Sequence, residues 1–208
     1  MTSYTREDWG SAYPRGGNPI SWTVSEVYIH HWDSGIQPHR DVESAMARMR
    51  NGQRFHAETN GWGDIGYSWT VDDIGNDYEA RGWWRTGAHT YGYNSKGYAV
   101  CWLGDSNVAL PSRAALEAIA RVIQRGITVG AIARNPTIVA HRDRVPDTSC
   151  CGDPMYAQLD QIRALATGGT IPTGGDDLTP EESALLKSLA GPYNVDVFIM
   201  GDGRWLSV

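Results

Sequence analysis

Residues 27–31 (Val-Tyr-Ile-His-His) form an apolar run that ends in two histidines. β-Branched and aromatic side chains favour a strand, so this stretch predicts a short strand with polar chemistry at its end. Residues 137–141 (Thr-Ile-Val-Ala-His) predict a second buried strand, which also ends in a histidine. Sheet proteins often assemble their sites from residues at the ends of neighbouring strands and in the loops beyond them. We therefore expect these two strands to build both the core and a functional site.

Further strands are predicted on either side of these two in the sequence. Residues 97–103 (Gly-Tyr-Ala-Val-Cys-Trp-Leu) form a near-continuous apolar run, which is typical of a strand buried on both faces. Residues 66–72 and 77–80 are separated by a turn-rich connection and predict a hairpin.

Helices are predicted where apolar side chains recur at helical spacing behind a capping residue. The predicted ranges and caps are 41–59 with Asp41, 112–126 with Ser112, and 153–166 with Asp153 followed by a proline. Gly52 is expected to weaken the first helix near its middle. Strands that alternate with helices indicate an α/β fold, with a central mixed β-sheet flanked by helices.

A change of composition marks a domain boundary. Residues 167–177 are rich in Gly, Thr and Pro, which predicts a linker between a domain at 1–166 and a small C-terminal segment at 178–208. Within that segment, residues 179–182 form a capping box that opens a helix, and residues 195–208 predict a hairpin. So short a segment buries little surface by itself. We expect it to dock on the main domain, on a partner or on another copy of itself.

Composition also restricts the class of function. The 208 residues include nine Trp and ten Tyr against two Phe, which suits either a groove for a polar ligand such as a sugar, or core packing. The net charge is −6 and no run of Lys or Arg occurs, so a nucleic-acid partner is not expected. No stretch approaches the roughly 20 apolar residues of a membrane span, so no membrane partner is expected. Residues 1–9 show no secretory signal.

The three cysteines do not form a disulfide framework. Cys150 and Cys151 are adjacent, where disulfide geometry is badly strained, and Cys101 lies far away in an apolar run. Cys101 is therefore predicted to be a small buried hydrophobic residue.

The histidines at the strand ends and the paired cysteines indicate a metal site. Neutral imidazole and thiolate are both good Zn²⁺ ligands, and three protein ligands leave the fourth position for water. A structural site would need a fourth ligand, for which His31 or Cys151 is available. A site with two histidines and one cysteine can also hold copper, although only Met155 is a candidate for its weak axial ligand.

A series of short blocks occurs in order between residues 6 and 165. The blocks are Arg6-Glu-Asp-Trp-Gly, Val27-Tyr-Ile-His-His, Gly61-Trp-Gly-Asp-Ile-Gly-Tyr, Glu79-Ala-Arg-Gly-Trp, Gly87-Ala-His-Thr, Gly92-Tyr-Asn-Ser, Ala140-His-Arg-Asp and Thr148-Ser-Cys-Cys-Gly-Asp. The series resembles the N-acetylmuramoyl-L-alanine amidases of the peptidoglycan recognition protein and bacteriophage lysin group. This resemblance implies cleavage of the amide between N-acetylmuramic acid and L-alanine, with Zn²⁺ as cofactor and peptidoglycan as partner.

The resemblance also assigns roles to individual residues. It implies zinc ligation by His30, His141 and Cys150, catalysis by Tyr67 and Thr148, and substrate binding by His89, Trp83 and Asn94. A phenol hydroxyl such as that of Tyr67 can stabilise the negative charge that develops on the amide oxygen during water attack. Thr148 can assist the same oxygen or orient the water. Strand alternation allows only one of His30 and His31 to face the site, and the choice of His30 is inherited from the family.

The sequence departs from the family around the cysteine ligand. The interval from His141 to Cys150 is one residue longer than in the family, and Cys151 replaces a proline. The extra residue is expected in the loop at 144–147, and if that loop does not absorb it, Cys151 would be the ligand.

Three other functions are compatible with the sequence. They are a recognition protein that binds peptidoglycan without cutting it, an amidase that acts as an inhibitor or partner of another enzyme, and a structural zinc domain. The cysteine and tyrosine together favour catalysis. The lack of a visible signal peptide and the appended segment fit a bacteriophage endolysin, located in the host cytoplasm until its release to the cell wall, where residues 178–208 are a candidate wall contact. A cytoplasmic recycling amidase is the competing source.

Overall fold

The computed structural model describes all residues except 33–34, 36, 169–196, 200–204 and 208. Internal contacts divide the chain into two units, Met1–Gly168 and Gly169–Val208. In the second unit, β7 (Val197–Ile199) pairs antiparallel with β8 (Trp205–Ser207), within the range predicted to form a hairpin. The helix predicted from Thr179 lies outside the described residues.

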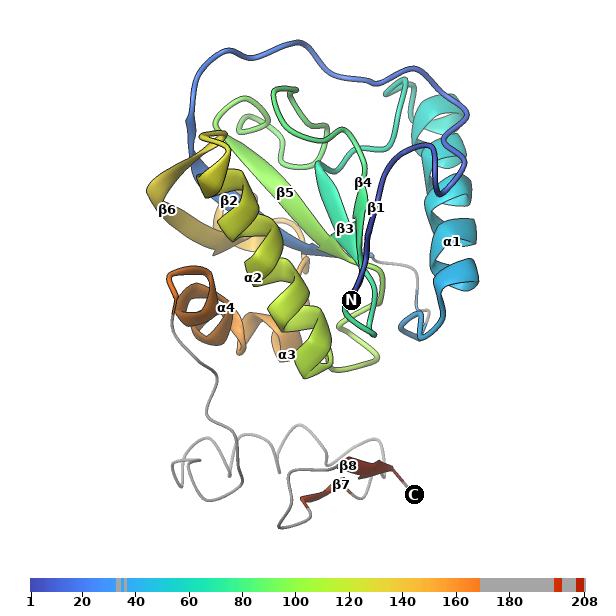
Figure 1. Ribbon diagram of the computed structural model, residues 1–208, viewed down its shortest axis with the longest axis vertical. Coiled ribbons are helices and arrows are strands. Elements are labelled where there is room, and N and C mark those ends of the chain that lie inside the picture. Colours follow the sequence, from blue (N-terminus) through green and yellow to red (C-terminus); the bar gives the residue numbers. More distant parts are fainter. Residues whose placement is uncertain (33–34, 36, 169–196, 200–204, 208) are drawn as a thin grey trace. The chain divides into compact units, whose positions relative to one another are not determined.

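Six strands form one mixed sheet in the first unit (Figure 1). They are β1 (Ser3–Tyr4), β2 (Val24–His31), β3 (Trp69–Val71), β4 (Asp77–Glu79), β5 (Gly97–Trp102) and β6 (Ile132–Ala140), in the order β1-β4-β3-β5-β2-β6. The central strand β2 runs parallel to both β5 and β6, whereas β3 and β4 form the predicted antiparallel hairpin. The mixed sheet that the sequence predicts is therefore confirmed. Parallel pairing brings the carboxyl ends of β2 and β6 to the same edge of the sheet.

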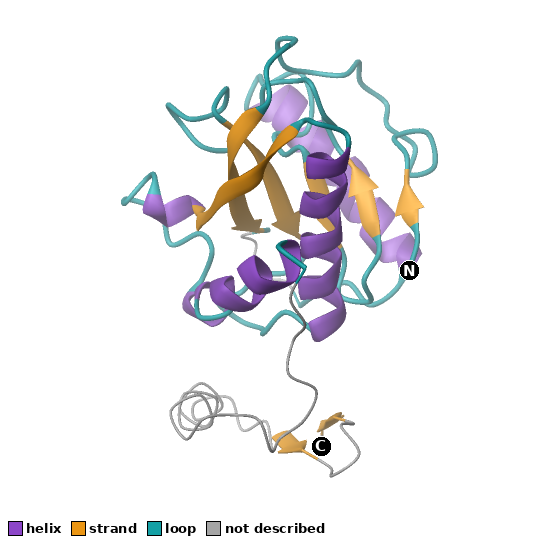
Figure 2. Cartoon of the chain, turned by 60° about the vertical axis from the view of Figure 1, so that its left-hand side comes forward, coloured by secondary structure: helices purple, strands orange, loops and turns teal. Residues whose placement is uncertain are grey.

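Helices cover both faces of this sheet (Figure 2). They are α1 (Val42–Arg54), which continues into a π-helical turn at Phe55–Thr59, α2 (Arg113–Thr128), α3 (Asp153–Tyr156) and α4 (Leu159–Ala166). Helix α2 crosses one face with α4 beside it, and α1 lies on the opposite face. Among the described residues, no helix has the length and apolar character that crossing a membrane requires.

The predicted helix caps are confirmed for the first two helices but not for the third. Asp41 accepts a hydrogen bond from the backbone N–H of Ser44, and Ser112 accepts one from Ala115. The N-cap of α3 is Gly152, so the prediction of Asp153 as cap is wrong. The Asp153 carboxylate instead forms an ion pair with the Arg142 guanidinium, at 2.7 Å. The helix predicted over 153–166 is also divided into α3 and α4.

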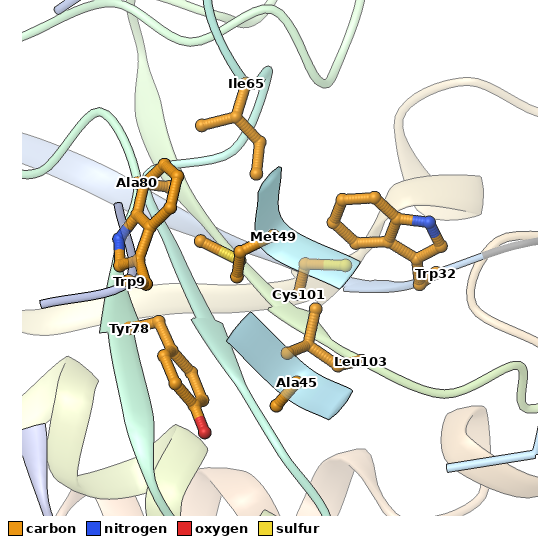
Figure 3. Packing of buried hydrophobic residues seen from close by; sticks show 9 residues of the cluster. All are labelled: Trp9, Trp32, Ala45, Met49, Ile65, Tyr78, Ala80, Cys101 and Leu103. Carbon is orange, nitrogen blue, oxygen red and sulfur yellow. The ribbon is translucent and has the colours of Figure 1, made fainter. Parts of the chain in front are cut away.

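Gly52 lies in α1 without ending the helix. A Cβ atom at this position would lie 2.1 Å from the Trp32 ring, so the missing side chain leaves room for the indole. Close packing of the ring offsets the low helix propensity of glycine. The surrounding core cluster is drawn in Figure 3 and consists of Trp9, Trp32, Ala45, Met49, Ile65, Tyr78, Ala80, Cys101 and Leu103. Cys101 is fully buried in it, as predicted.

Strand alternation assigns side chains to the two faces of the sheet. Cys101 packs with Met49 of α1, so it lies on the α1 face, and its register partner His30 lies on that face too. Trp69 lies on the α2 face, where the Arg125 guanidinium stacks over its ring at 4.2 Å. The face of the sheet that carries His30 therefore lies against α1.

Candidate metal centre

Two histidines and one cysteine meet at the carboxyl ends of β2 and β6. His30 is the penultimate residue of β2, His141 opens the short 3₁₀ turn that follows β6, and Cys150 lies in the loop after that turn. Their ligand atoms all lie within 4.8 Å of one another. The His30 and His141 ring centroids are 4.4 Å apart, and Cys150 Sγ lies 3.5 Å from His30 Nδ1. The structure thus brings together the three predicted ligands.

The chemistry of this group fits zinc. Burial lowers the pKa of the His30 imidazole well below its usual range, and the neighbouring His141 lowers it further. Burial also lowers the pKa of His141. Two neutral imidazoles therefore offer lone pairs next to a buried sulfur atom, which is a borderline-soft donor set that Zn²⁺ prefers.

Neither neighbouring alternative belongs to this group. The His31 side chain points to the other side of β2, where its Nδ1 lies 2.9 Å from the backbone nitrogen of Ser106 and 3.3 Å from Asp105. Burial raises the pKa of the Cys151 thiol to about 12. Among the described residues, the metal-ligand group contains His30, His141 and Cys150 without His31 or Cys151.

The loop that carries Cys150 is held from two sides. On one side, the Arg142 backbone N–H donates to the Cys150 carbonyl at 2.7 Å, and the Arg142 guanidinium donates to the Cys151 carbonyl. On the other side, the Gly152 N–H donates to Ser106 Oγ at 2.8 Å. A Cβ at Gly152 would lie 2.7 Å from the Ser106 carbonyl oxygen, so glycine allows this close approach. These contacts fix the backbone on both sides of the Cys150 thiol.

Tyr67 lies beside this group. It is partly buried, and its ring centroid is 5.3 Å from that of His30 and 5.5 Å from that of Trp32. Burial raises the pKa of the Cys101 thiol, and a hydrogen bond with Tyr67 opposes that shift. The structure therefore places the predicted catalytic tyrosine next to one predicted ligand.

The segment that leads into Tyr67 is held by buried polar groups. The Arg81 guanidinium donates to the carbonyl oxygens of Ile65 and Trp62, at 2.8 and 3.0 Å. The Gly66 N–H donates to His56 Nδ1 at 3.2 Å. Burial, with a smaller contribution from Arg81, lowers the pKa of His56 to about 4, so the ring is neutral and able to accept this bond.

Thr148 has a local role in the cysteine loop. Its hydroxyl oxygen accepts the backbone N–H of Cys150 at 3.2 Å. This bond helps to shape the loop around the ligand. The predicted assistance to catalysis stays a prediction.

The three predicted substrate-binding residues lie in different places. His89 is buried, with its ring centroid 5.5 Å from that of His30. The Asn94 side-chain oxygen accepts the backbone N–H groups of both His89 and Thr90, each at 2.9 Å. Trp83 is not brought to the metal-ligand group, because its ring contacts Trp69 on the α2 face at 5.2 Å.

Sequence reasoning did not identify every residue around the site. Thr90 places its hydroxyl between two histidines, His56 supports the Tyr67 segment, and Ser106 and Arg142 hold the cysteine loop. Thr90 and Arg142 directly follow His89 and His141, two predicted site residues. This adjacency is the one feature of the sequence that could have pointed to them. Nothing in the sequence marks Ser106.

Comparison with known proteins assigns the family. Residues 21–153 match the N-acetylmuramoyl-L-alanine amidase family (Amidase_2). The chain belongs to this family. It is 39% identical over 153 residues to an N-acetylmuramoyl-L-alanine amidase of Sus scrofa, a match that covers 73% of this chain and 25% of that protein. This amidase-family chain therefore spans about a quarter of the length of that curated relative.

Solved structures show the same fold in this family. Drosophila PGRP-LB superposes with a TM-score of 0.72 at 30% identity, covering 77% of this chain and 94% of that one. Peptidoglycan recognition protein-LE, in complex with tracheal cytotoxin, a monomeric diaminopimelic acid-type peptidoglycan, gives a TM-score of 0.69 at 28% identity. That match covers 76% of this chain and 92% of that one.

Proposed function

We propose that this amidase-family chain is a zinc-dependent enzyme that hydrolyses the amide bond between N-acetylmuramic acid and L-alanine in peptidoglycan. The observation that carries the proposal is the convergence of His30, His141 and Cys150 within 4.8 Å, with Tyr67 beside them. Peptidoglycan as substrate is supported by the family and by the relatives that bind a peptidoglycan fragment.

In the proposed hydrolysis, each residue of the site has a separate role. His30, His141 and Cys150 would hold the ion; His30 and Cys150 are buried, whereas His141 is partly exposed. Zn²⁺ bound there supplies a water molecule with a pKa of about 7 and a Lewis acid for the amide carbonyl. The Tyr67 hydroxyl donates to the carbonyl oxygen as negative charge develops on it. Thr148, through its bond to the Cys150 backbone, keeps the thiolate in place.

The test is incubation of the full chain with purified bacterial cell walls, followed by quantification of newly exposed L-alanine amino termini. The zinc-loaded protein should release termini, and the chelator-treated protein should not. Binding to the walls without new termini would favour a non-catalytic recognition protein instead. That alternative has support because relatives of known structure include peptidoglycan recognition proteins.

The role of Tyr67 has a separate test. Tyr67→Phe removes one hydroxyl donor and should lower kcat by about 10²–10³-fold. Its zinc content should equal that of the wild type, because the substitution leaves His30, His141 and Cys150 unchanged. An unchanged kcat would remove Tyr67 from the mechanism.

We extend the proposal to the biological setting, a bacteriophage endolysin that reaches the wall only after release from the host cytoplasm. The support is the sequence resemblance to the peptidoglycan recognition protein and bacteriophage lysin group. Cells that express the protein in the cytoplasm should remain intact until chloroform permeabilises the inner membrane, and should then lyse. Lysis before permeabilisation would contradict this setting.

A further inference from the structure

The Thr90 hydroxyl lies between two histidine rings at the edge of the metal centre. Thr90 is fully buried, and its Oγ1 is 3.2 Å from His30 Nε2 and 2.9 Å from His89 Nδ1. The Asn94 side-chain oxygen accepts the backbone N–H groups of residues 89 and 90, which fixes the position of this hydroxyl.

The two ring nitrogens of His30 face different groups. Nδ1 lies 3.5 Å from Cys150 Sγ and so faces the other predicted ligands. Nε2 faces the Thr90 hydroxyl. A metal-binding histidine is usually oriented by a partner that accepts the proton of its second nitrogen.

We propose that Thr90 is a positioning residue of the metal centre: its hydroxyl accepts the Nε2–H of His30 and so presents the Nδ1 lone pair to the ion. The inference rests on the proposed zinc site. It assigns to Thr90 a role in metal binding, without contact with the ion or the substrate.

The metal also determines the direction of the whole hydrogen-bond chain. A neutral imidazole carries one N–H, so a His30 ring that offers Nδ1 to the ion must carry its proton on Nε2 and donate it to Thr90. The threonine then donates its own hydroxyl proton to His89 Nδ1. His89 in turn carries its ring proton on Nε2.

This direction has a consequence for His89, a predicted substrate-binding residue. Its Nε2 is buried and has no hydrogen-bond partner within the described part of the chain. A Cβ at Gly87 would lie 2.2 Å from this nitrogen, so the glycine leaves the space that the ring edge occupies. The chain from His30 through Thr90 therefore makes His89 Nε2 a hydrogen-bond donor.

The proposal is tested by zinc affinity, measured by competition with a chelating dye on the full chain. Thr90→Val keeps the shape of the side chain but removes the hydroxyl, and should weaken zinc binding by about 10–100-fold. Thr90→Ser keeps the hydroxyl and should retain wild-type affinity. Thr70→Val is the matched control, because Thr70 is also fully buried but its hydroxyl contacts Met49 Sδ in the core. It should bind zinc as the wild type does.

The outcomes separate this inference from the proposed function. A wild-type protein that binds no zinc rejects the zinc site itself. Wild-type affinity in Thr90→Val, or equal losses in Thr90→Val and Thr90→Ser, rejects the role of the hydroxyl while leaving the zinc site intact. Imidazole ¹⁵N NMR of the zinc-loaded wild type needs no variant: it should show His30 protonated on Nε2 and metal-bound through Nδ1. The opposite assignment would overturn the proposal.

Discussion

The two faces of the sheet bury different kinds of side chain. On the α2 face, the helix buries a run of aliphatic side chains, namely Ala115, Leu116, Ala118, Ile119, Ala120, Val122 and Ile123. On the α1 face, His30, Cys101 and Tyr67 lie among polar and titratable groups that are tied together by hydrogen bonds and ring contacts. The first face is mainly aliphatic where it meets α2, and the second combines a hydrophobic core with the candidate metal site.

This difference indicates that the two faces contribute differently to stability and to the arrangement of the site. Aliphatic burial is non-directional and tolerates any partner of suitable volume, so the α2 face can supply stability without specifying chemistry. Buried polar groups must each be satisfied by a correctly placed partner, so the α1 face can specify one arrangement of side chains. We therefore expect substitutions of the metal-ligand group and of the Thr90 hydroxyl that supports it to change zinc binding, and substitutions of the buried aliphatic residues of α2 to change stability.

The largest effect is expected from Cys150→Ser. Removal of the thiolate ligand should weaken zinc binding by more than about 100-fold, beyond the usual effect of losing a supporting group, and should abolish amidase activity. Cys151→Ser is the matched control, because that adjacent buried sulfur lies outside the metal-ligand group. Zinc titration of both variants checks the prediction. Loss of zinc from Cys151→Ser with retention by Cys150→Ser would exchange the two assignments.

Ile123→Ala tests the opposite face. Ile123 is fully buried in α2, and its truncation leaves a cavity that should lower the free energy of unfolding by about 2–5 kcal/mol. The zinc affinity of the folded variant should stay unchanged. Val129→Ala, at a half-exposed position that follows α2, should change stability little. Urea unfolding and zinc titration measure the two quantities, and a loss of zinc affinity in Ile123→Ala would break the division between the faces.

Gly52→Ala should reverse the usual effect of this substitution in a helix. Helix propensity alone favours alanine by about 1 kcal/mol. Overlap of the new methyl group with the Trp32 ring should instead lower the free energy of unfolding by about 1–3 kcal/mol. Asn51→Ala, at an exposed neighbouring position, should be neutral or stabilising. A stabilised Gly52→Ala protein would show that the indole moves away easily.

A pH-dependent effect on stability is expected from His56. Its pKa is lowered from 6.5 to about 4 by burial, so between these values the unfolded chain binds a proton that the folded chain does not. Stability contributed by the neutral ring is therefore complete above pH 6.5 and is lost as the pH falls toward 4, by up to about 1.4 kcal/mol per pH unit. His56→Gln should reduce this slope by the part due to one histidine. Urea unfolding of the zinc-free proteins at several pH values measures it, and equal slopes would contradict the assignment.

Sequence reasoning succeeded where structure depends on near neighbours. Asp41 and Ser112 cap their helices through residues three positions ahead, and the apolar run at 97–103 predicted a strand buried on both faces, which is β5. Asp153 is the first residue of α3 and not its cap, and its carboxylate pairs with Arg142, eleven residues away in the sequence. Strand β1 has only two residues and leaves no detectable pattern.

The residues of the site were predicted less completely than the elements of the fold. Family resemblance named the residues that the structure groups, but sequence spacing alone left His31 and Cys151 as alternatives, because the path of the loop is set by Arg142 and Ser106. The side of the sheet that Trp83 faces depends on its contact with Trp69, which no local pattern encodes. Thr90 was overlooked because its role depends on two rings that converge only after folding.

The parallel arrangement of β2 and β6 has a topological consequence. Cys150 and His30 are 120 residues apart in the chain yet lie side by side, so an ion shared by them joins distant segments as a covalent cross-link would. Keeping such a loop closed in the unfolded chain costs about 5 kcal/mol of entropy, so unfolding and release of the ion are expected to occur together. The apparent stability of the protein should then rise with the logarithm of the free zinc concentration, which makes metal supply a determinant of how long the folded chain survives.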